Sequence, residues 1–376
     1  MRALVVIILI TLSMFVITKE ASRQMFMRPG VASFLTEKNP PAGFAYATDK
    51  RTFSFPGDHG QHPKFRSEWW YFTGNISNDA NREFGFQLTL FRFALNPKDT
   101  VSESPWRKND IFMGHFAISD IEAGVFHSFE RQSRSALHMA GVADVPLKLW
   151  IRDWTFDRLD GDGEMWRLKA HENGFEIDLL LRARRPITLQ GEDGLSKKNH
   201  LPGNASYYYS ITRLASSGTI STPGGTHTVT GDAWFDHEWS TSALAEGQLG
   251  WDWFSLQLDD QREIMFYQIR NASGQRDQAS HGIIVSQNGS KTRLNAGDLR
   301  FRVEEYWHSA ASGARYPARW RVEIPAEHID IIVTPRFHDQ EWRKNFTYWE
   351  GAVAVSGVSN GQDVHGKGYV ELVGYE

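Results

Sequence analysis

The chain has 376 residues, of which 41% are hydrophobic, 23% charged and 13% aromatic, so it is not a disordered protein and it is long enough for two domains. A net charge of −4 and the lack of any basic run argue against nucleic acid as a partner. With no cysteine in the chain, disulfides, thiol nucleophiles and thiolate metal sites are excluded.

The N-terminal segment predicts export from the cytosol. Arg2 precedes a largely apolar run that ends at Lys19 and Glu20, as in a secretory signal segment. We expect residues 1–24 to be a signal peptide or, because small residues are poorly placed for cleavage, an uncleaved anchor that provides the membrane contact. Either outcome predicts a periplasmic or secreted protein, with residues 25–50 as a lead segment.

Alternating apolar and polar residues dominate the chain after residue 50. Apolar side chains recur at every second position in 166–170 and in 175–181, with Asn173 and Gly174 between these two runs. This pattern is typical of a β-hairpin with its own turn. Similar turn signals recur along the chain, and no segment has a sustained helical apolar stripe. The sequence therefore predicts an all-β fold of short antiparallel strands.

An internal echo of aromatic strands points to two similar domains. The segment 68–77 and its expected hairpin partner 83–93 are echoed by 250–258 and 262–270. In both halves an aromatic-rich strand begins a hairpin. Self-similarity of this kind is a signature of duplicated architecture.

A second echo relates the expected closing strands of the two halves. Residues 231–236 resemble residues 366–371, and each segment could close a barrel of its own. The small and polar segment 240–249 lies between the halves. We therefore predict an N-terminal domain at 51–242 and a C-terminal domain at 243–376.

The stretch GDAWFDHEWS, near the end of the N-terminal domain, carries an acid, a histidine and a second acid in succession. Side chains alternate between the faces of a strand. Trp234, Asp236 and Glu238 should therefore share one face, while His237 and Trp239 share the other. Acids beside tryptophan recur elsewhere in the chain, and an aromatic wall with a few polar groups is what a small-molecule pocket needs.

We predict one pocket at the junction of the two domains. The strand that closes the first domain and the strand that opens the second are joined by a short link, which should hold their ends together. The catalytic candidates are Asp236, His237, Glu238, Trp239 and Asp252. The ligand-binding candidates are Trp69, Trp70, Tyr71, Tyr208, Trp234, Trp251, Trp253 and Phe254.

The acids and His237 could instead have purely structural roles. Acids near a barrel rim often pair with arginine, and His237 could be a hydrogen-bonded structural histidine. His59 and His62 lack the further ligands of a recognisable motif, so no metal and no cofactor are expected. The G-x-S-x-G match at residues 357–361 lacks the following helix of a nucleophile elbow and is interpreted as a hairpin turn.

Several long motifs resemble the AttH-like family of secreted proteins, which is related to the carotenoid 1,2-hydratases. The resemblance implies two lipocalin-like β-barrel domains in tandem. It also implies that His237 and Trp239 match the His–Trp pair of the hydratase branch, with Asp252 as the candidate for that branch's Asp. The motifs are HPKFRSEWWYFTGN (62–75), YYYSITR (207–213), GDAWFDHEWS (231–240), GWDWFSLQL (250–258) and YWEGAVAVSG to GYVELVGY (348–375).

Two functions are compatible with this resemblance. The first is a hydro-lyase or hydrolase acting on a hydrophobic, isoprenoid or lipid-like molecule. Here a carboxyl group buried among Trp rings would supply the proton and the rings would stabilise a carbocation. The second is a non-catalytic lipocalin-like binding protein associated with an ABC transporter. A carboxylate within reach of the ligand would favour the enzyme.

Overall fold

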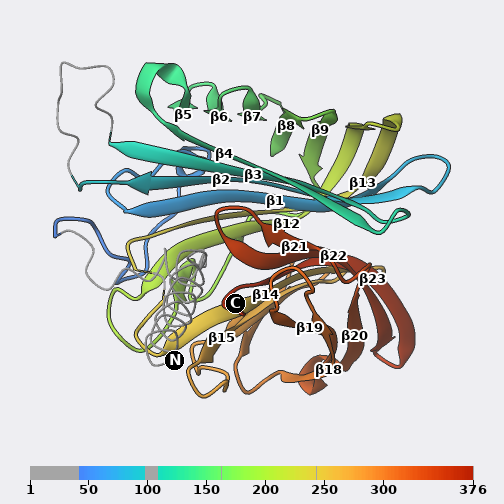
Figure 1. Cartoon of the computed structure of the whole chain (residues 1–376). Coiled ribbons are helices and arrows are strands. Elements are labelled where there is room, and N and C mark those ends of the chain that lie inside the picture. Colours follow the sequence, from blue (N-terminus) through green and yellow to red (C-terminus); the bar gives the residue numbers. More distant parts are fainter. Residues whose placement is uncertain (1–41, 98–108, 162, 243, 376) are drawn as a thin grey trace, which may run out of the picture.

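The structure is a computed structural model that describes residues 42–97, 109–161, 163–242 and 244–375 (Figure 1). The predicted signal peptide or anchor and most of the lead segment lie outside these residues. Within the described part of the chain, no helix is long and apolar enough to cross a membrane. Its regular elements are strands, together with three 3-10 turns at Gly57–His59, Ala136–His138 and Pro325–Glu327.

The first sheet is antiparallel and has the order β4-β3-β2-β1-β13-β12-β9-β8-β7-β6-β5. Two further short strands, β10 and β11, pair with β12. The strands are β1 (Ser67–Ser77), β2 (Glu83–Ala94), β3 (Asp110–Asp120), β4 (Val125–Arg134), β5 (Ala140–Asp144), β6 (Leu147–Ile151), β7 (Trp154–Arg158), β8 (Met165–Glu172), β9 (Phe175–Ala183), β10 (Thr188–Leu189), β11 (Leu195–Lys197), β12 (Ala205–Thr222) and β13 (Gly225–Ser240).

The second sheet, also antiparallel, has the order β17-β16-β15-β14-β23-β22-β20-β19-β18, and β21 pairs with β22. Its strands are β14 (Gln248–Leu258), β15 (Glu263–Asn271), β16 (His281–Val285), β17 (Lys291–Asn295), β18 (Arg300–His308), β19 (Arg315–Ile324), β20 (Ile329–Pro335), β21 (Glu341–Arg343), β22 (Thr347–Ser359) and β23 (Gln362–Leu372).

Each sheet curls around its own apolar core, which confirms the predicted all-β fold of two tandem lipocalin-like barrels. In the first sheet, β6 packs across the interior against β2, β3 and β4. The described strands leave each ladder open, so both units are near-barrels. The two sheets lie face to face, and the chain passes from one to the other between β13 and β14 (Figure 1).

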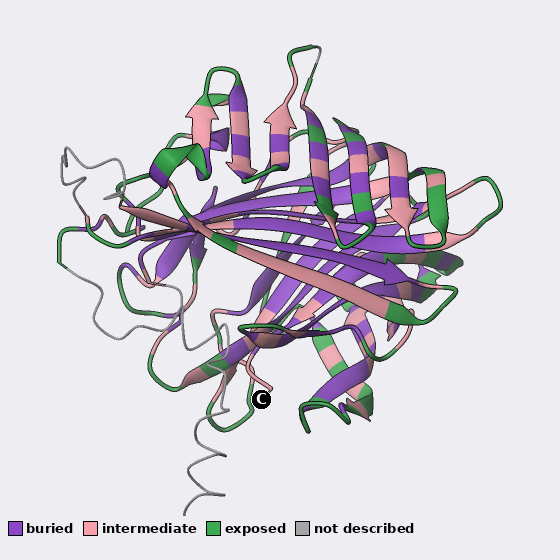
Figure 2. Ribbon diagram, turned by 45° about the horizontal axis from the view of Figure 1, so that its top comes forward, coloured by how far each residue is buried: buried purple, intermediate pink, exposed green. Residues whose placement is uncertain are grey.

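The predicted hairpin at β8 and β9 is confirmed. Its turn is formed by Asn173 and Gly174, with φ values of 50° and 84°, a left-handed conformation that suits these two residue types. Buried and exposed residues alternate along both strands. Figure 2 shows this alternation as stripes on the outer strands, whose far face meets solvent. The match at 357–361 is likewise a hairpin turn, between β22 and β23.

The central strands of both sheets are buried on both faces, because one face meets the barrel core and the other meets the opposite sheet (Figure 2). A third apolar cluster, with residues from both sheets, fills the space between them. Gly85 is needed for this approach, since a Cβ atom there would lie 2.6 Å from the Tyr369 hydroxyl and 2.8 Å from Cβ of Ala352. The arrangement leaves room for a cavity between the sheets.

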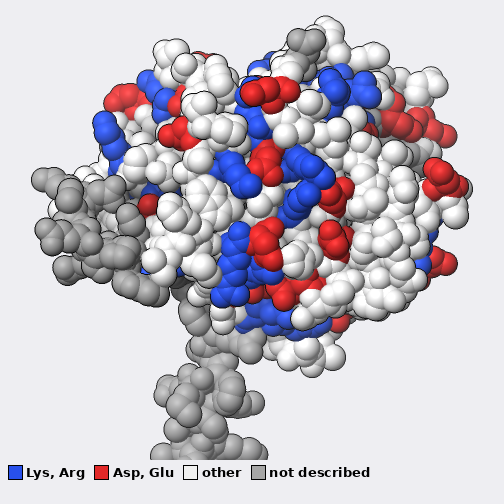
Figure 3. All heavy atoms as spheres, turned by 90° about the horizontal axis from the view of Figure 1, so that it is seen from above, with Lys and Arg blue, Asp and Glu red and all other residues white. Residues whose placement is uncertain are grey.

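Charged residues of both signs are mixed over the outer face of the first sheet (Figure 3). Arg167 pairs with Asp178 and Lys148 with Asp157 across neighbouring strands. Such mixing produces no extended field of one sign on this face.

Candidate active site between the two sheets

A cavity lies between the two sheets. Its empty space is about 870 Å³ when the open solvent at its mouth is counted, and the centre of a water-sized sphere can occupy about 90 Å³ of it. Aromatic side chains from both domains form most of its wall, and a few ionisable groups interrupt it. This combination is typical of small-molecule sites. The lining residues are Trp69, Tyr71, Gln87, Phe91, Lys198, Tyr208, Asp236, Glu238, Leu244, Trp251, Trp253, Tyr267, Ile269, Tyr348 and Glu371.

Two acids occupy equivalent places in the two halves of the cavity wall. Asp236 of β13 lies opposite Tyr71 of β1, and Glu371 of β23 lies opposite Trp253 of β14. The echoed strands therefore both present acids to the shared space, and β13 adds a second one, Glu238. Glu371 was absent from the sequence-based candidates, although the second echo aligns it with Asp236.

Asp236 is held by three donors. The Tyr208 hydroxyl donates to Oδ2 at 2.7 Å, and Oδ1 accepts hydrogen bonds from Trp234 Nε1 at 2.7 Å and Ser210 Oγ at 2.5 Å. Burial raises the pKa of Asp236 to about 7, although these hydrogen bonds act in the opposite direction. Asp236 is thus poised between its two protonation states, but its oxygens are already engaged.

Glu371 is freer than Asp236. Its Oε1 accepts a hydrogen bond of 3.0 Å from Trp251 Nε1, and none of the described residues hydrogen-bonds its Oε2. Burial raises the pKa of Glu371 to about 8, and the charges of Glu238 and Asp236 act in the same direction. At neutral pH it is therefore a carboxylic acid with one oxygen held by Trp251, on a side chain that lines the aromatic cavity.

A second buried carboxyl group lies beside Glu371. Glu350 of β22 is its partner across the ladder, and the Tyr71 hydroxyl donates to Glu350 Oε1 at 2.6 Å. Burial raises the pKa of Glu350 well above its ordinary value, and the nearby charge of Glu371 adds to the effect. Because two neighbouring carboxylates repel each other, this pair retains at least one proton at neutral pH.

Unlike Glu371 and Glu350, Glu238 is paired with a positive charge. Its Oε1 lies 2.7 Å from the ammonium nitrogen of Lys198, and Ser206 also donates to it. Lys198 is stacked over the Tyr267 ring at 4.5 Å. This ion pair gives the cavity one strongly polar wall that can orient a hydroxyl or carbonyl group of a ligand.

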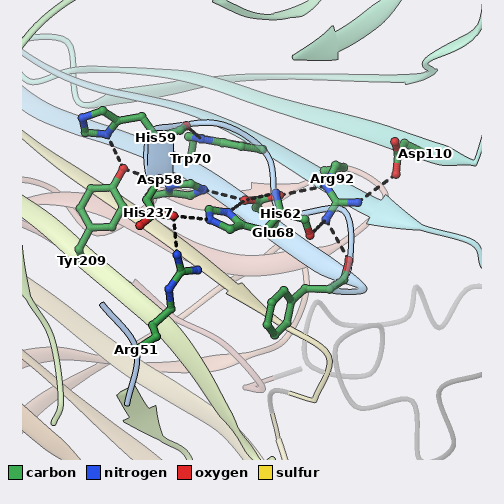
Figure 4. Close-up of polar contacts among 11 residues, drawn as sticks. Arg51, Asp58, His59, His62, Glu68, Trp70, Arg92, Asp110, Tyr209 and His237 are labelled. Carbon is green, nitrogen blue, oxygen red and sulfur yellow. Dashed lines mark hydrogen bonds and ion pairs between the residues drawn. The ribbon is translucent and has the colours of Figure 1, made fainter. Parts of the chain in front are cut away.

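His237 and Trp239 do not line this cavity, so the prediction of one shared pocket is wrong for them. They point into the core of the first barrel, as strand alternation requires. Nε2 of His237 lies 3.0 Å from Glu68 and Nδ1 lies 3.1 Å from the Tyr209 hydroxyl (Figure 4). Burial lowers the pKa of His237 to about 4, so the ring is neutral at pH 7. This geometry fits the structural alternative.

Glu68 is the centre of a buried ion network in the first barrel (Figure 4). It lies 3.0 Å from Arg92 Nε and 2.6 Å from His62 Nδ1, and both its oxygens accept from the His62 backbone amide. Burial alone would raise its pKa, but His62, His237 and Arg92 together lower it. The His62 ring stacks on Trp239 with centroids 3.6 Å apart. His237, through its contact with Glu68, and Trp239, through its stacking on His62, are therefore both held in the core of the first barrel.

His62, Glu68 and His237 also have the donor types and proximity of a metal-binding group. The three side chains already bond one another directly, at 2.6 and 3.0 Å. The guanidinium of Arg92 contacts the same carboxylate, and its positive charge disfavours a cation there. The cluster is therefore better described as a hydrogen-bonded ion network than as a metal centre.

Asp252 also faces away from the cavity, into the second barrel. Its oxygens accept hydrogen bonds from Arg270 Nε at 3.1 Å, Gln268 Nε2 at 2.6 Å and the Tyr375 hydroxyl at 2.9 Å. The prediction that it lines the shared pocket is wrong, because its neighbours Trp251 and Trp253 occupy that face of the strand.

The ligand-binding candidates divide in the same way. Trp69, Tyr71, Tyr208, Trp251 and Trp253 line the cavity as predicted. Two exceptions follow from strand alternation, since Trp70 stacks on His237 in the first barrel and Phe254 stacks on Phe266 in the second. Trp234 belongs to the apolar cluster between the sheets but does not line the cavity, and it donates a hydrogen bond to Asp236.

These positions predict the effect of Asp252→Asn. The substitution should lower the free energy of unfolding by about 2 kcal/mol, because Arg270 loses a charged hydrogen-bond partner, and leave ligand binding in the cavity unchanged. Urea denaturation and fluorescence titration with a hydrophobic dye would measure the two quantities. A large loss of dye affinity at unchanged stability would contradict the assignment.

Comparisons with known proteins agree with the fold. The model of the AttH-like family matches residues 46–375. The crystal structure of a protein described as AttH, from Nitrosomonas europaea, is 31% identical, with 89% of this chain and all of that chain covered and a TM-score of 0.77. Kievitone hydratase from Nectria haematococca is 15% identical, with 90% and 96% covered and a TM-score of 0.65, which shows the fold alone.

One protein that matches by sequence is named a dehydratase, the reverse of a hydratase activity. The dehydratase asqC of Emericella nidulans is 24% identical over 150 residues, which are 37% of this chain and 41% of that protein. The match thus spans about two fifths of its length.

Proposed function

The chain belongs to the AttH-like family, and we propose that it is a hydro-lyase that adds water to, or removes water from, a hydrophobic small molecule in the cavity between its two sheets. The observation that carries this proposal is Glu371, which lines the aromatic cavity, has one oxygen held by Trp251 and has its pKa raised to about 8 by burial. The names of the hydratase and dehydratase relatives support the same reaction class.

The reaction assigns a role to each group of cavity residues. In the hydration direction, Glu371 gives its proton to an alkene carbon, which leaves a tertiary carbocation on the neighbouring carbon. The aromatic side chains of Trp69, Trp251 and Trp253 stabilise that cation by about 2 kcal/mol or more, as cation–π contacts shielded from bulk solvent do. A water molecule then attacks the cation and loses a proton. Dehydration is the same sequence in reverse.

The cavity suits a ligand that is apolar over most of its length. Glu238 and Lys198 form the polar part of the wall, which suits a hydroxyl or carbonyl group at one end of the molecule. A carboxyl group open to the ligand favours this enzyme over a binding protein without catalysis.

Isotope incorporation tests the proposal on a panel of candidate compounds. We expect the purified protein, incubated in H₂¹⁸O with terpenoid and aryl alkenes and tertiary alcohols, to produce alcohols that carry ¹⁸O, detected by mass spectrometry. Heat-denatured protein is the control. If compounds quench the cavity tryptophans but no ¹⁸O is incorporated, the protein is a binder.

The pKa of Glu371 predicts how the rate of hydration changes with pH. A general acid must be protonated to act, and the pKa of Glu371 is raised to about 8. The rate of hydration should therefore be sustained through pH 7 and fall as the pH rises through about 8. A rate that instead fell between pH 4 and 5, as expected for an ordinary Glu carboxyl group, would contradict the role of Glu371.

A further inference from the structure

We propose that Tyr348, His115 and Glu130 form a proton relay that acts as the general base of the hydration step and leads from the cavity to solvent. This inference rests on the proposed function. The three side chains come from β22, β3 and β4, so the relay crosses from one sheet to the other. Tyr348 begins the motif at 348–375, whereas His115 and Glu130 lie outside the motifs quoted above.

The relay begins at the cavity wall. Tyr348 lines the cavity, and its hydroxyl lies 2.8 Å from Nδ1 of His115. The His115 ring is fully buried and stacks on Trp342 at a centroid distance of 4.2 Å, so its orientation is fixed. Tyr348 can thus accept a proton from water in the cavity while it passes its own proton to His115.

The other ring nitrogen of His115 faces Glu130. Nε2 lies 3.5 Å from Glu130 Oε2, and neither atom has another hydrogen-bond partner among the described residues. The two residues are partners across the β3–β4 ladder, so the backbone holds them in place. A small side-chain movement makes an N–H···O bond, which stabilises the imidazolium that forms when Tyr348 releases its proton.

The protonation states agree with this direction of transfer. Burial lowers the pKa of His115, although Glu130 acts in the opposite direction, so the ring is neutral and can accept a proton. Burial alone would raise the pKa of Glu130, but the facing His115 ring and a hydrogen bond from Asn345 outweigh it, and the group stays a carboxylate. Burial raises the pKa of Tyr348 well above its ordinary value, so proton gain and loss at its oxygen are concerted.

The relay ends at the surface. The side chain of Glu130 is 7% exposed, and the residue lines an open polar cleft together with Arg131 and Asn345. A proton that reaches Glu130 can leave to solvent through this cleft.

Atoms and protons balance over the complete hydration cycle. The alkene takes a proton from Glu371, and the water oxygen forms the new C–O bond. The proton that this water loses goes to Tyr348 Oη as the Tyr348 proton goes to His115 Nδ1. The imidazolium then releases its Nε2 proton through Glu130 to solvent, which leaves the neutral ring with its proton on Nδ1. A proton taken up from solvent along the same path in reverse restores Nε2–H, returns the Nδ1 proton to Tyr348 and delivers the Tyr348 proton through cavity water to the Glu371 carboxylate. The net change is alkene plus water to alcohol.

The same chain offers a matched control in the core of the first barrel. There the Tyr209 hydroxyl lies 2.6 Å from His59 Nδ1, and His59 Nε2 lies 3.0 Å from Glu164. The residue types and contacts are those of the relay, but none of these three side chains lines the cavity.

The experiment compares Glu130→Gln and Tyr348→Phe with Glu164→Gln, on the compound that incorporates ¹⁸O fastest in the wild type. We expect kcat to fall about 100-fold in Tyr348→Phe and about 10-fold in Glu130→Gln, with KM within about twofold, and kcat of Glu164→Gln to stay within about twofold. Equal kcat values for Glu130→Gln and Glu164→Gln would overturn the relay while leaving the hydratase proposal in place.

A second measurement does not depend on turnover. ¹⁵N NMR of labelled histidine, assigned with His115→Gln, should show a neutral His115 ring that carries its proton on Nε2. A proton on Nδ1 would mean that His115 donates to Tyr348 and would overturn the relay. If no compound incorporates ¹⁸O, the proposed function fails, and the tautomer alone decides whether this arrangement of proton donors and acceptors exists.

Discussion

Glu371→Gln should lower the rate of ¹⁸O incorporation by about 10²- to 10⁴-fold, the range that general acids contribute. The amide keeps the shape of the side chain and can still accept the hydrogen bond from Trp251, but it has no acidic proton to give. Ligand affinity should change little, because the aromatic wall is untouched. Rates from mass spectrometry and affinities from tryptophan quenching separate these two effects.

Glu371→Asp is a second variant that tests whether a carboxyl group is needed at this position. It restores a carboxyl group but withdraws it by one methylene, so its rate should lie between those of Glu371→Gln and the wild type. Should Glu371→Gln retain the wild-type rate, the proton must come from elsewhere, and Asp236 would be the next candidate, since its pKa is about 7.

Arg92→Met should lower the free energy of unfolding by about 3–5 kcal/mol, because it leaves the buried carboxylate of Glu68 without its guanidinium partner. Arg92 is fully buried, with Nε 3.0 Å from Glu68, Nη1 3.0 Å from Asp110, and Nη2 3.0 and 2.9 Å from the His62 and Phe65 carbonyl oxygens. Urea denaturation at pH 7 gives the measurement.

Arg167→Met is the control for this prediction. Arg167 makes two hydrogen bonds of 2.8 Å to Asp178, but its side chain is 46% exposed, and surface pairs contribute about 1 kcal/mol or less. The double variant Glu68→Gln/Arg92→Met should recover part of the loss, since it removes the unpaired charge. Similar losses for the two single arginine variants would show that the buried network is not a principal source of stability.

The network also links stability to pH. The pKa of Glu68 is lowered in the folded state, so its contribution is present above the unfolded value of 4.5 and is lost as the pH falls below it. Acid sensitivity should therefore be weaker in the double variant than in the wild type.

The fold could be predicted because its signals are local. Strand alternation and Asn173-Gly174 placed the β8–β9 hairpin, and the two echoes indicated two similar units. The alternation and the turn depend on residues close together in the sequence, and each echo compares two short local patterns. The placement of one sheet on the other depends instead on long-range contacts such as the approach at Gly85, which no short pattern encodes.

The site could be predicted only in part. Alternation correctly separated Asp236 from His237, but both faces of their strand are buried, so hydrophobicity did not indicate which face meets the other sheet. Tyr348, His115 and Glu130 come together only in three dimensions. Glu371 could have been identified as a candidate from the sequence, because the echo with residues 231–236 places it where Asp236 lies in the first half.

Burial of the central strands on both faces has a consequence for how the chain folds during synthesis. The first sheet is complete at Ser240, before the strands that cover it have been made. Until β14 and β23 are in place, Tyr71, Tyr208 and Trp234 remain open to water as one aromatic surface. Such an intermediate is prone to aggregate and is a substrate for chaperones. The nascent protein is therefore most vulnerable between the synthesis of its two halves.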